Sequence, residues 1–441
     1  LTNKLTVAKA YTAAIDTASE VVAYSGTVSA TAARATLATV DASTVVASFD
    51  VATPVASVVT TANATPAADA VAAKTFALTT GADGMTGTSV NDTFNGSLIF
   101  DSSEVATTAA TFTIADTLNG GGGTGDTINL VVSGAQNTSV VVPSASISNI
   151  ETLNIRNTIA ETASVDASSI TGLTLLTADR GIGAVTVTNL ASGAEASMIG
   201  NGTIANGAFS VGYVAAATAA TLNVTAGTTA GANVITGTGI LSQVVNSTGA
   251  ANTTGALTGA ASATSTTINA TTALTTAAAT NLGATVTITG AGAVSTGSTA
   301  LESGVTSLNA SANTGGLTVA LGSAVTQAVT GSAGDDSITS GAILTTGSVN
   351  AGAGDDTLVI GTNVSHANTA ALAAKYTNFE TLSVGNSFDM SLYPDVTGVT
   401  AVAMTSKSLT GLTATHAANV TVAGDQATAF TVALAAATGT S

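Results

Sequence analysis

Short runs that alternate apolar or β-branched residues with Thr or Asn dominate the chain from residue 74 onward. This period of two is the pattern of a strand with one buried face, because successive side chains of a strand point to opposite sides. Gly, Asn and Ser separate the runs, as expected of turns. The clearest runs are residues 184–188, 221–224, 284–289, 316–320 and 419–422. The pattern predicts a mainly β chain, folded either as a stacked β-solenoid or as an elongated sandwich.

The first 73 residues have a different pattern. Apolar residues recur at helical spacing from Leu5 to Val21, and a second helix is predicted over residues 31–40. The stretch over residues 41–73 is ambiguous, because Pro54 and Pro66 interrupt it as helix breakers. The sequence therefore predicts a small α-helical segment over residues 1–73. This segment is expected either to cap the β part or to act as a docking bundle.

A long internal repeat links two distant parts of the β region. Each copy has Gly-rich turns that end in Asp and then an apolar strand that contains Glu-Thr-Leu. Asp126 precedes Glu151 by 25 positions in the first copy, and Asp356 precedes Glu380 by 24 in the second. Composite motifs that recur with nearly the same spacing indicate a modular architecture. The predicted segments are the helical 1–73, a first β module over 74–155, a Thr/Ala-rich β-solenoid over 156–330 and a second β module over 331–441.

Two turns of the second copy, residues 331–338 and 351–358, have the composition of a calcium-binding loop. Gly permits a left-handed backbone that turns carbonyls inward, and Asp adds a hard, anionic oxygen. Calcium takes about 6–8 oxygen ligands, which two successive turns can supply. The alternative is a set of glycine turns in which Asp caps the backbone. The candidate Ca²⁺ ligands are Asp83, Asn91, Asp92, Asp126, Asp335, Asp336, Asp355 and Asp356.

Four residues of the repeat require separate interpretation. Ser332 and Ala351 stand where the regular pattern has glycines. Glu151 and Glu380 each lie inside an apolar strand. An exposed strand position is the default interpretation for these two glutamates. A calcium ligand, or an anchor between successive turns of a solenoid, is the alternative, because a buried carboxylate requires partners.

Composition restricts the function further. The chain has 8 Lys+Arg against 25 Asp+Glu, for a net charge of −17, and only 7% of its residues are charged. So few basic residues argue against nucleic-acid binding, which depends on neutralising phosphates. No unbroken apolar run reaches the roughly 18 residues of a membrane helix, so no membrane insertion is expected. The absence of Cys excludes disulfides, thiolate nucleophiles and Cys-type zinc sites.

Residues 81–155 and 331–384 resemble the RTX-type surface-layer proteins of Gram-negative bacteria. Their Gly/Asp turns are similar to the nonapeptide G-G-x-G-x-D-x-U-x, and an Ile- or Phe-Glu-Thr-Leu element follows. The resemblance implies an elongated right-handed parallel β-solenoid, of the RTX β-roll or β-helix kind, that binds Ca²⁺ and self-assembles into a two-dimensional lattice. It also implies secretion to the cell surface and attachment through a helical N-terminal region. The implied partners are further copies of the chain and cell-surface polysaccharide or lipopolysaccharide.

The sequence gives little support for catalysis. His366 and His416 are isolated in Thr/Ala segments and are expected to be solvated. Adjacent aspartates in Gly turns are explained better by binding of a divalent ion than by general acid–base catalysis. We therefore expect that the chain is not an enzyme. A carbohydrate-active β-helix enzyme is the weakest alternative. The stronger one is an extracellular adhesin or surface-binding solenoid, since the Thr-x-Thr run at 285–289 resembles the flat Thr arrays of ice-binding solenoids.

Overall fold

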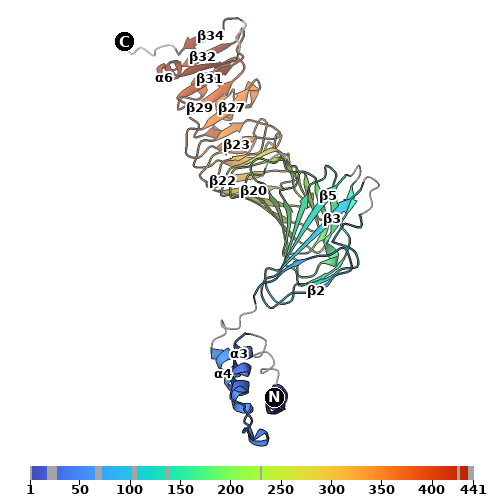
Figure 1. The fold of residues 1–441 in the computed structure, drawn as a ribbon. Coiled ribbons are helices and arrows are strands. Elements are labelled where there is room, and N and C mark those ends of the chain that lie inside the picture. Colours follow the sequence, from blue (N-terminus) through green and yellow to red (C-terminus); the bar gives the residue numbers. More distant parts are fainter. Residues whose placement is uncertain are drawn as a thin grey trace. The chain divides into compact units, whose positions relative to one another are not determined.

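The computed structural model describes residues 2–16, 27–64, 72–101, 107–135, 139–228, 231–424 and 428–435. The chain divides into two compact units (Figure 1). The first contains residues 1–74 together with two short segments, 87–92 and 121–124. The second contains residues 75–86, 93–120 and 125–441. The three predicted β modules therefore all contribute strands to the second unit.

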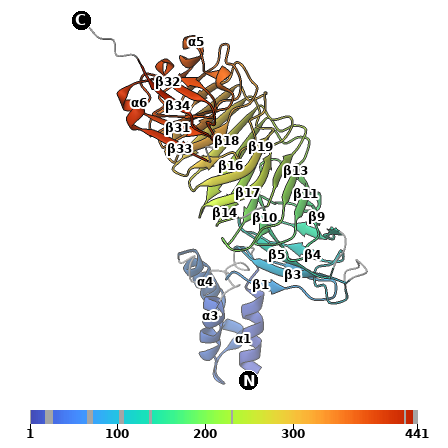
Figure 2. The same ribbon diagram turned by 90° about the horizontal axis from the view of Figure 1, so that it is seen from above.

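The first unit is helical, as its pattern predicts. Its elements are α1 (Thr2–Ala13), α3 (Thr27–Ala38), the 3-10 turn η1 (Val46–Ser48) and α4 (Ala52–Ala64). Val7, Tyr11, Val40, Val55 and Val58 are buried and form its described core. The three helices stand together in the ribbon of Figure 2, and α3 packs on both α1 and α4.

Two details of this unit differ from the sequence-based expectation. The first helix ends at Ala13, so Ile15 lies beyond it, whereas the apolar spacing ran on to Val21. Val21 and Pro66 lie outside the described residues. Pro54 does not break a helix but lies in the first turn of α4. A proline is tolerated there because the backbone N–H groups of a first turn have no intrahelical acceptor.

The second unit is a parallel β-solenoid of about 13 turns, which confirms the predicted fold class. The chain crosses from one long sheet to the other and back, so strands that are neighbours in a sheet are not consecutive in sequence. All described pairings are parallel, for example β8 with β10 and β10 with β12. Sheet 1 is β1 (Thr75–Ala77), β3 (Thr93–Phe100), β5 (Thr127–Gly134), β8 (Thr152–Asn157), β10 (Leu175–Asp179), β12 (Glu195–Ile199), β14 (Ala219–Thr225), β16 (Ser242–Thr248), β18 (Ser265–Ala270), β20 (Thr285–Gly290), β22 (Ser307–Asn313), β24 (Ala328–Thr330), β26 (Ser348–Asn350) and β28 (Tyr376–Thr377).

A second long sheet and two short ones complete the described solenoid. Sheet 2 is β6 (Val140–Val141), β9 (Ala163–Asp166), β11 (Val185–Leu190), β13 (Phe209–Tyr213), β15 (Asn233–Thr236), β17 (Asn252–Thr258), β19 (Leu274–Thr280), β21 (Val294–Ser295), β23 (Leu317–Ala320), β25 (Ser337–Thr339), β27 (Thr357–Gly361), β29 (Thr381–Val384), β31 (Gly398–Val402) and β33 (Val420–Ala423). The short sheets are β2 (Gly84–Thr86), β4 (Thr117–Asn119) and β7 (Ser146–Ser148), and β30 (Phe388–Asp389), β32 (Ser408–Leu412) and β34 (Thr431–Leu434).

The alternating pattern fixes which side chains fill the solenoid. In β8, Leu153, Ile155 and Asn157 point inward and are buried, while the residues between them are half-buried on the outer face. Register partners stack like with like, so Ile128 lies beside Leu153 and Leu153 beside Leu176. Parallel strands lie about 4.8 Å apart, which lets one apolar column run through the whole stack. The interior is therefore a continuous core rather than a channel.

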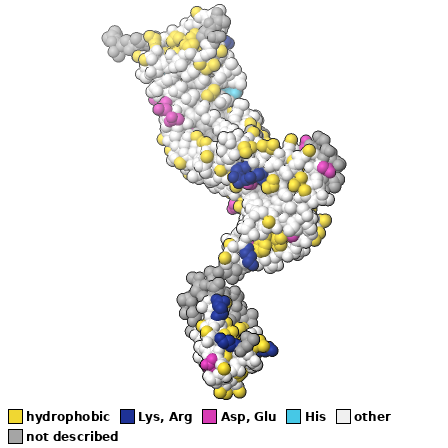
Figure 3. All heavy atoms as spheres, viewed as in Figure 1, with side chains coloured by type: hydrophobic (Ala, Val, Ile, Leu, Met, Phe, Trp, Pro, Cys, Tyr) yellow, Lys and Arg dark blue, Asp and Glu magenta, His cyan; other side chains and the backbone are white. Residues whose placement is uncertain are grey.

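Short helical elements interrupt the solenoid turns. They are η2 (Ala167–Ser169), η3 (Val364–His366), α5 (Ala370–Ala373), η4 (Met390–Leu392) and α6 (Ala414–Ala418). No helix in the described ranges has the length and apolar character needed to cross a membrane. Most of the face in Figure 3 is uncharged, and its Lys, Arg, Asp and Glu side chains lie in small, separate groups.

Candidate metal centres

Successive turns of the second repeat stack one carboxylate on the next. Asp336, Asp356 and Glu380 directly precede β25, β27 and β29, which are neighbours in sheet 2. Oδ1 of Asp336 accepts the backbone N–H of Leu317 at 2.7 Å. Oδ1 of Asp356 accepts the N–H of Asp336 at 2.7 Å, and Oε2 of Glu380 accepts the N–H of Asp356 at 2.8 Å. Asp336, Asp356 and Glu380 are named the second carboxylate ladder below.

The first repeat has the same arrangement in sheet 1. Asp126 and Glu151 directly precede β5 and β8, and Oε2 of Glu151 accepts the N–H of Asp126 at 2.8 Å. The carbonyls of Asp126 and Asp356 each accept two N–H groups from the following turn, at 2.9 and 3.1 Å in both cases. The repeat seen in the sequence is therefore a repeat of local geometry, even though its two copies lie in different sheets.

Glu151 and Glu380 each hold three consecutive turns together. Besides accepting an N–H from the turn before, each offers its carbonyl to a threonine of the turn after it. Thr174 donates its N–H to Glu151 at 2.9 Å and its hydroxyl at 3.2 Å, and Thr397 bonds Glu380 at 2.9 and 3.3 Å. Both glutamates are half-buried. The geometry is that of an anchor between turns, so the default of an exposed strand position is wrong.

In the second carboxylate ladder, a hydroxyl four residues before the aspartate completes the turn at Asp336. Ser332 donates its backbone N–H to Oδ2 of Asp336 at 2.7 Å and its hydroxyl to Oδ1. Ser332 is thus not a defect of the glycine pattern but part of the turn. Burial raises the pKa of Asp336, and the bonds from Ser332 and Leu317 oppose that rise. The same Ser/Thr-x-x-x-Asp turn occurs at Thr79–Asp83 and Thr88–Asp92.

Asp92 is the clearest case of an aspartate that caps a turn. It accepts the backbone N–H of Lys74 at 2.5 Å, the backbone N–H of Thr88, and the Thr88 hydroxyl at 2.9 Å. Burial disfavours its ionised form, but these hydrogen bonds outweigh burial and hold the pKa of Asp92 below its ordinary value. A carboxylate satisfied by donors in this way matches the capping alternative raised from the sequence.

Asp116 is a buried carboxylate that the sequence analysis missed. It is 1% exposed, and it accepts the N–H of Thr113 at 2.7 Å and the N–H of Asp83 at 3.0 Å. Asp83 in turn accepts the N–H of Thr79 at 2.7 Å. The Thr-x-x-Asp spacing at 113–116 resembles the turns above and was the available signal. It lacks the glycines of the calcium-loop pattern.

Asp356 differs from Asp336, its neighbour in the second carboxylate ladder. It is completely buried, and its Oδ2 has no hydrogen-bond partner among the described residues. Gly352 stands where Ser332 stands one turn earlier, so no hydroxyl is available. Burial and the nearby charges of Asp336 and Glu380 raise the pKa of Asp356 to about 6, against the bond from the Asp336 N–H. The protein thus buries a carboxylate oxygen without a donor, which is costly unless a proton or a cation compensates.

The remaining candidate ligands lie at the surface. Asp335 and Asp355 are exposed, and Oδ1 of Asp335 accepts the N–H of Asp355 at 2.9 Å. Asn91 is exposed and accepts the N–H of Thr124 at 3.0 Å. The two adjacent aspartates of each turn therefore differ, since the second joins the buried ladder and the first faces solvent.

The ladders are linear rather than convergent. Within the described ranges, no group of three or more His, Asp or Glu side chains is close enough to hold a metal ion by itself. A calcium site here would have to complete its shell with backbone carbonyls, as calcium sites commonly do. Asp356 fits such a site, because its Oδ2 is buried and has no hydrogen-bond partner among the described residues.

Both histidines form hydrogen bonds with neighbouring Ser or Thr residues of the fold. His416 is fully buried, and its Nδ1 accepts the N–H of Thr413 at 3.2 Å while its own N–H bonds the Thr413 hydroxyl at 3.1 Å. It completes a capping box at the start of α6, so the expectation that it is solvated was wrong. His366 is half-buried, with Nδ1 3.2 Å from the Ser340 hydroxyl.

No protein-family model matches the chain, and no curated protein matches it.

Proposed function

We propose that the chain is the structural subunit of a surface layer on a Gram-negative cell, secreted and assembled into a lattice through Ca²⁺. The observation that carries the proposal is the buried Asp356, whose Oδ2 has no partner among the described residues. A cation at this oxygen would satisfy it and would make folding of the second repeat depend on calcium. No catalytic step is part of the proposal.

Charge density supports a divalent ion at this position. Asp335, Asp336, Asp355 and Asp356 lie on two successive turns, and Glu380 lies on the third. Both ion pairs in the described part of the chain involve Asp179 instead, so no Lys or Arg neutralises this cluster. Hard carboxylate and carbonyl oxygens are the ligands that calcium prefers. Bound calcium would also reduce the net charge of −17 and allow copies to approach one another.

The solenoid itself suits a structural subunit. Its interior is filled by stacked apolar columns, and its outer faces carry mainly uncharged Thr, Asn and Ser. Contacts between copies through such faces would carry a small desolvation penalty, because few charged groups would be buried. The helical first unit is the candidate for attachment to cell-surface polysaccharide or lipopolysaccharide, as the resemblance implies.

Electron microscopy of the purified chain, in millimolar calcium and in excess chelator, tests the proposal. We expect ordered sheets or tubes only in calcium. Asp356→Asn should remove the calcium requirement of the second repeat and prevent ordered assembly. Asp395→Asn is the matched control, because Asp395 is an exposed carboxylate outside the ladder. A lattice that forms equally in chelator, or that Asp356→Asn leaves intact, would contradict the role of calcium.

An adhesin or ice-binding solenoid is the second candidate, and one observation favours it. Asn223, Asn246 and Asn269 stack on the outer face of sheet 1 with amide–amide bonds of 2.8 and 2.9 Å, and the Thr289 hydroxyl bonds Asn269 at 2.8 Å. Such a row presents regularly spaced polar groups that could bind a flat surface such as ice. Thermal hysteresis measurements would test the ice-binding form, and normal freezing behaviour would remove it.

A further inference from the structure

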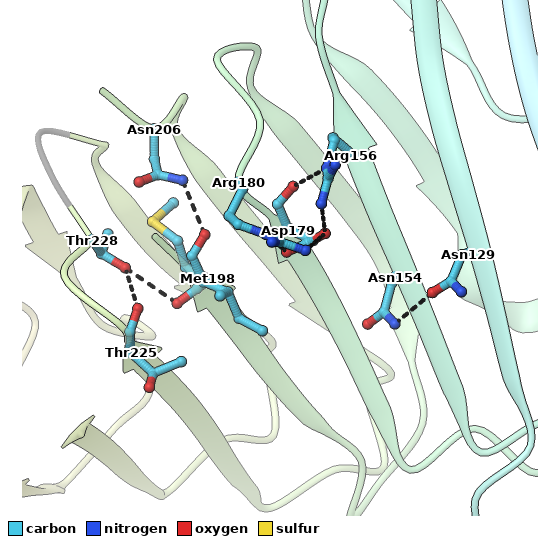
Figure 4. A network of polar contacts seen from close by, with 10 residues as sticks. Asn129, Asn154, Arg156, Asp179, Arg180, Met198, Asn206, Thr225 and Thr228 are labelled. Carbon is cyan, nitrogen blue, oxygen red and sulfur yellow. Dashed lines mark hydrogen bonds and ion pairs between the residues drawn. The ribbon is translucent and has the colours of Figure 1, made fainter. Parts of the chain in front are cut away.

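Positive charge is scarce in the β-solenoid and is concentrated at one place. Residues 75–441 contain 20 of the 25 acidic residues but only four of the eight basic ones. Two of these four, Arg156 and Arg180, are the only arginines in that range. They come from adjacent turns, because Arg156 belongs to β8 and Arg180 directly follows β10 (Figure 4). They are named the arginine pair below.

Both arginines form an ion pair with the same aspartate, Asp179. Nη2 of Arg156 lies 2.6 Å from Oδ2 of Asp179, and Nε of Arg180 lies 2.7 Å from its Oδ1. Nη2 of Arg180 also bonds Oδ2 at 3.0 Å. Two positive charges on one carboxylate leave one positive charge in excess. No described residue accepts a hydrogen bond from Nη1 of either arginine, so donors for a further carboxylate remain.

The arginine pair is held in a fixed position. Arg180 has a left-handed φ of 48°, which is unusual for a residue with a long side chain. Gly181 follows, and a Cβ there would lie 2.5 Å from the carbonyl oxygen of Asn157. The Asn157 amide is buried and bonds the carbonyls of Glu161 and Ala184 at 2.7 and 2.8 Å. The turn therefore maintains a strained backbone that keeps the guanidinium group of Arg180 on the carboxylate of Asp179.

The surroundings of the arginine pair have the composition of a protein interface. The side chains of Arg156 and Arg180 are 39% and 47% exposed. Val131, the register partner of Arg156, is 38% exposed, and Ile182 is 55% exposed. Arginine is enriched at protein–protein interfaces and among their hot spots. A polysaccharide phosphate would use the arginines but not the aliphatic rim.

The chain carries one matching feature, namely the exposed aspartates of the second repeat. Asp335 and Asp355 precede β25 and β27, which are adjacent strands of sheet 2, and they form no ion pair among the described residues. Adjacent parallel strands lie about 4.8 Å apart. The arginine pair also comes from adjacent turns, so each pair spans two neighbouring turns of the solenoid. Asp335 and Asp355 are named the aspartate pair below.

We propose that the arginine pair of one copy binds the aspartate pair of a second copy of this chain. Two solenoid edges that lie side by side with matched turns bring two guanidinium groups onto two carboxylates. The two surfaces are different, so the contact is heterologous and leaves one partner surface free on each copy. Repetition of such a contact gives an open row of subunits. The inference rests on the proposed function and assigns calcium to the buried Asp356 rather than to the exposed pair.

Charge removal and charge exchange test the contact. Arg156→Gln with Arg180→Gln should raise the concentration needed for assembly roughly tenfold, since two exposed ion pairs are lost. Lys375→Glu, a charge reversal elsewhere on the solenoid, should have little effect. Arg156→Glu with Arg180→Glu should prevent assembly, as should Asp335→Arg with Asp355→Arg. A chain carrying all four exchanges, or an equimolar mixture of the two reversed chains, should assemble again.

Circular dichroism and calorimetric calcium titration of the unassembled chains separate the possible failures. Arginine variants that remain folded, bind calcium like the parent and no longer assemble support the contact. Assembly that is unaffected by the glutamine pair, or reversed chains that do not rescue each other, would overturn it while leaving the calcium lattice intact. A parent chain that sedimentation shows to be monomeric at high concentration in calcium would contradict both proposals.

Discussion

Oε2 of Glu380 accepts the backbone N–H of Asp356 at 2.8 Å, the same bond that joins Glu151 to Asp126. This bond connects two turns of the solenoid through a side chain, in addition to the backbone ladder of the strands. In the second repeat it also brings a second carboxylate close to the buried Asp356. In this turn the hydrogen bond to the backbone N–H of Asp356 stabilises the fold, whereas repulsion between the two carboxylates destabilises it.

The first prediction concerns pH. The pKa of Asp356 is raised from 3.8 to about 6, so the folded protein favours its neutral form. A raised pKa contributes stability that is complete below the unfolded value and is lost as the pH rises through the folded one. In chelator, the parent chain and Asp356→Asn should therefore have similar free energies of unfolding near pH 4. At pH 7 the free energy of unfolding of the parent chain should be lower by about 2 kcal/mol. Urea unfolding at both pH values measures this difference.

Calcium should reverse that order. At pH 7 in calcium, the parent chain should gain stability through the Asp356 carboxylate, whereas Asp356→Asn should gain little. Asp395→Asn serves as the control and should follow the parent under every condition. A constant difference between Asp356→Asn and the parent from pH 4 to 7 would show that Asp356 does not titrate in this range.

The fold was largely predictable because period-two alternation depends only on which face of each strand is buried. The same alternation also distinguishes the adjacent aspartates, since Asp336 is in phase with the buried Ile338 and Asp335 with the half-buried Ser337. All four aspartates of the second repeat were nevertheless predicted as ligands together. Which oxygens find donors depends on contacts between turns that no local pattern contains, and calcium binding stays a prediction.

Other features were decided by tertiary context. Pro54 is a helix breaker by propensity, but it is tolerated in α4 because it lies in the first turn rather than further inside the helix. His416 is buried because α6 packs beside β31, β32 and β34, which its isolated Thr/Ala segment does not indicate. The arginine pair escaped the sequence analysis because Arg156 and Arg180 are 24 positions apart and meet only through strand register.

The second prediction concerns the hydroxyl of Ser332. It donates its one hydrogen to Oδ1 of Asp336, lies 2.9 Å from the carbonyl oxygen of Gly334 and accepts the N–H of Gly334 at 3.1 Å. Ser332→Ala should cost about 1–2 kcal/mol of unfolding free energy, because a buried carboxylate loses a donor. Chemical denaturation in chelator measures the loss. Ser365→Ala, at an exposed position, is the control, and equal unfolding midpoints for the two variants would contradict the role of the hydroxyl.

We expect the close approach of two turns to exclude a hydroxyl-bearing side chain from position 352 in the turn at Asp356. Gly352 has φ 109°, and a Cβ there would lie 2.1 Å from the carbonyl oxygen of Ser332. Gly352→Ala should therefore destabilise the chain by about 3 kcal/mol or more, through both backbone strain and a clash between turns. Gly361→Ala separates the two causes, because Gly361 also has a positive φ, 59°, but open space around its Cβ position. It should cost only about 1 kcal/mol. Thermal unfolding of both variants decides the matter, and similar losses would mean that strain alone, rather than the close approach of two turns, excludes a side chain at Gly352.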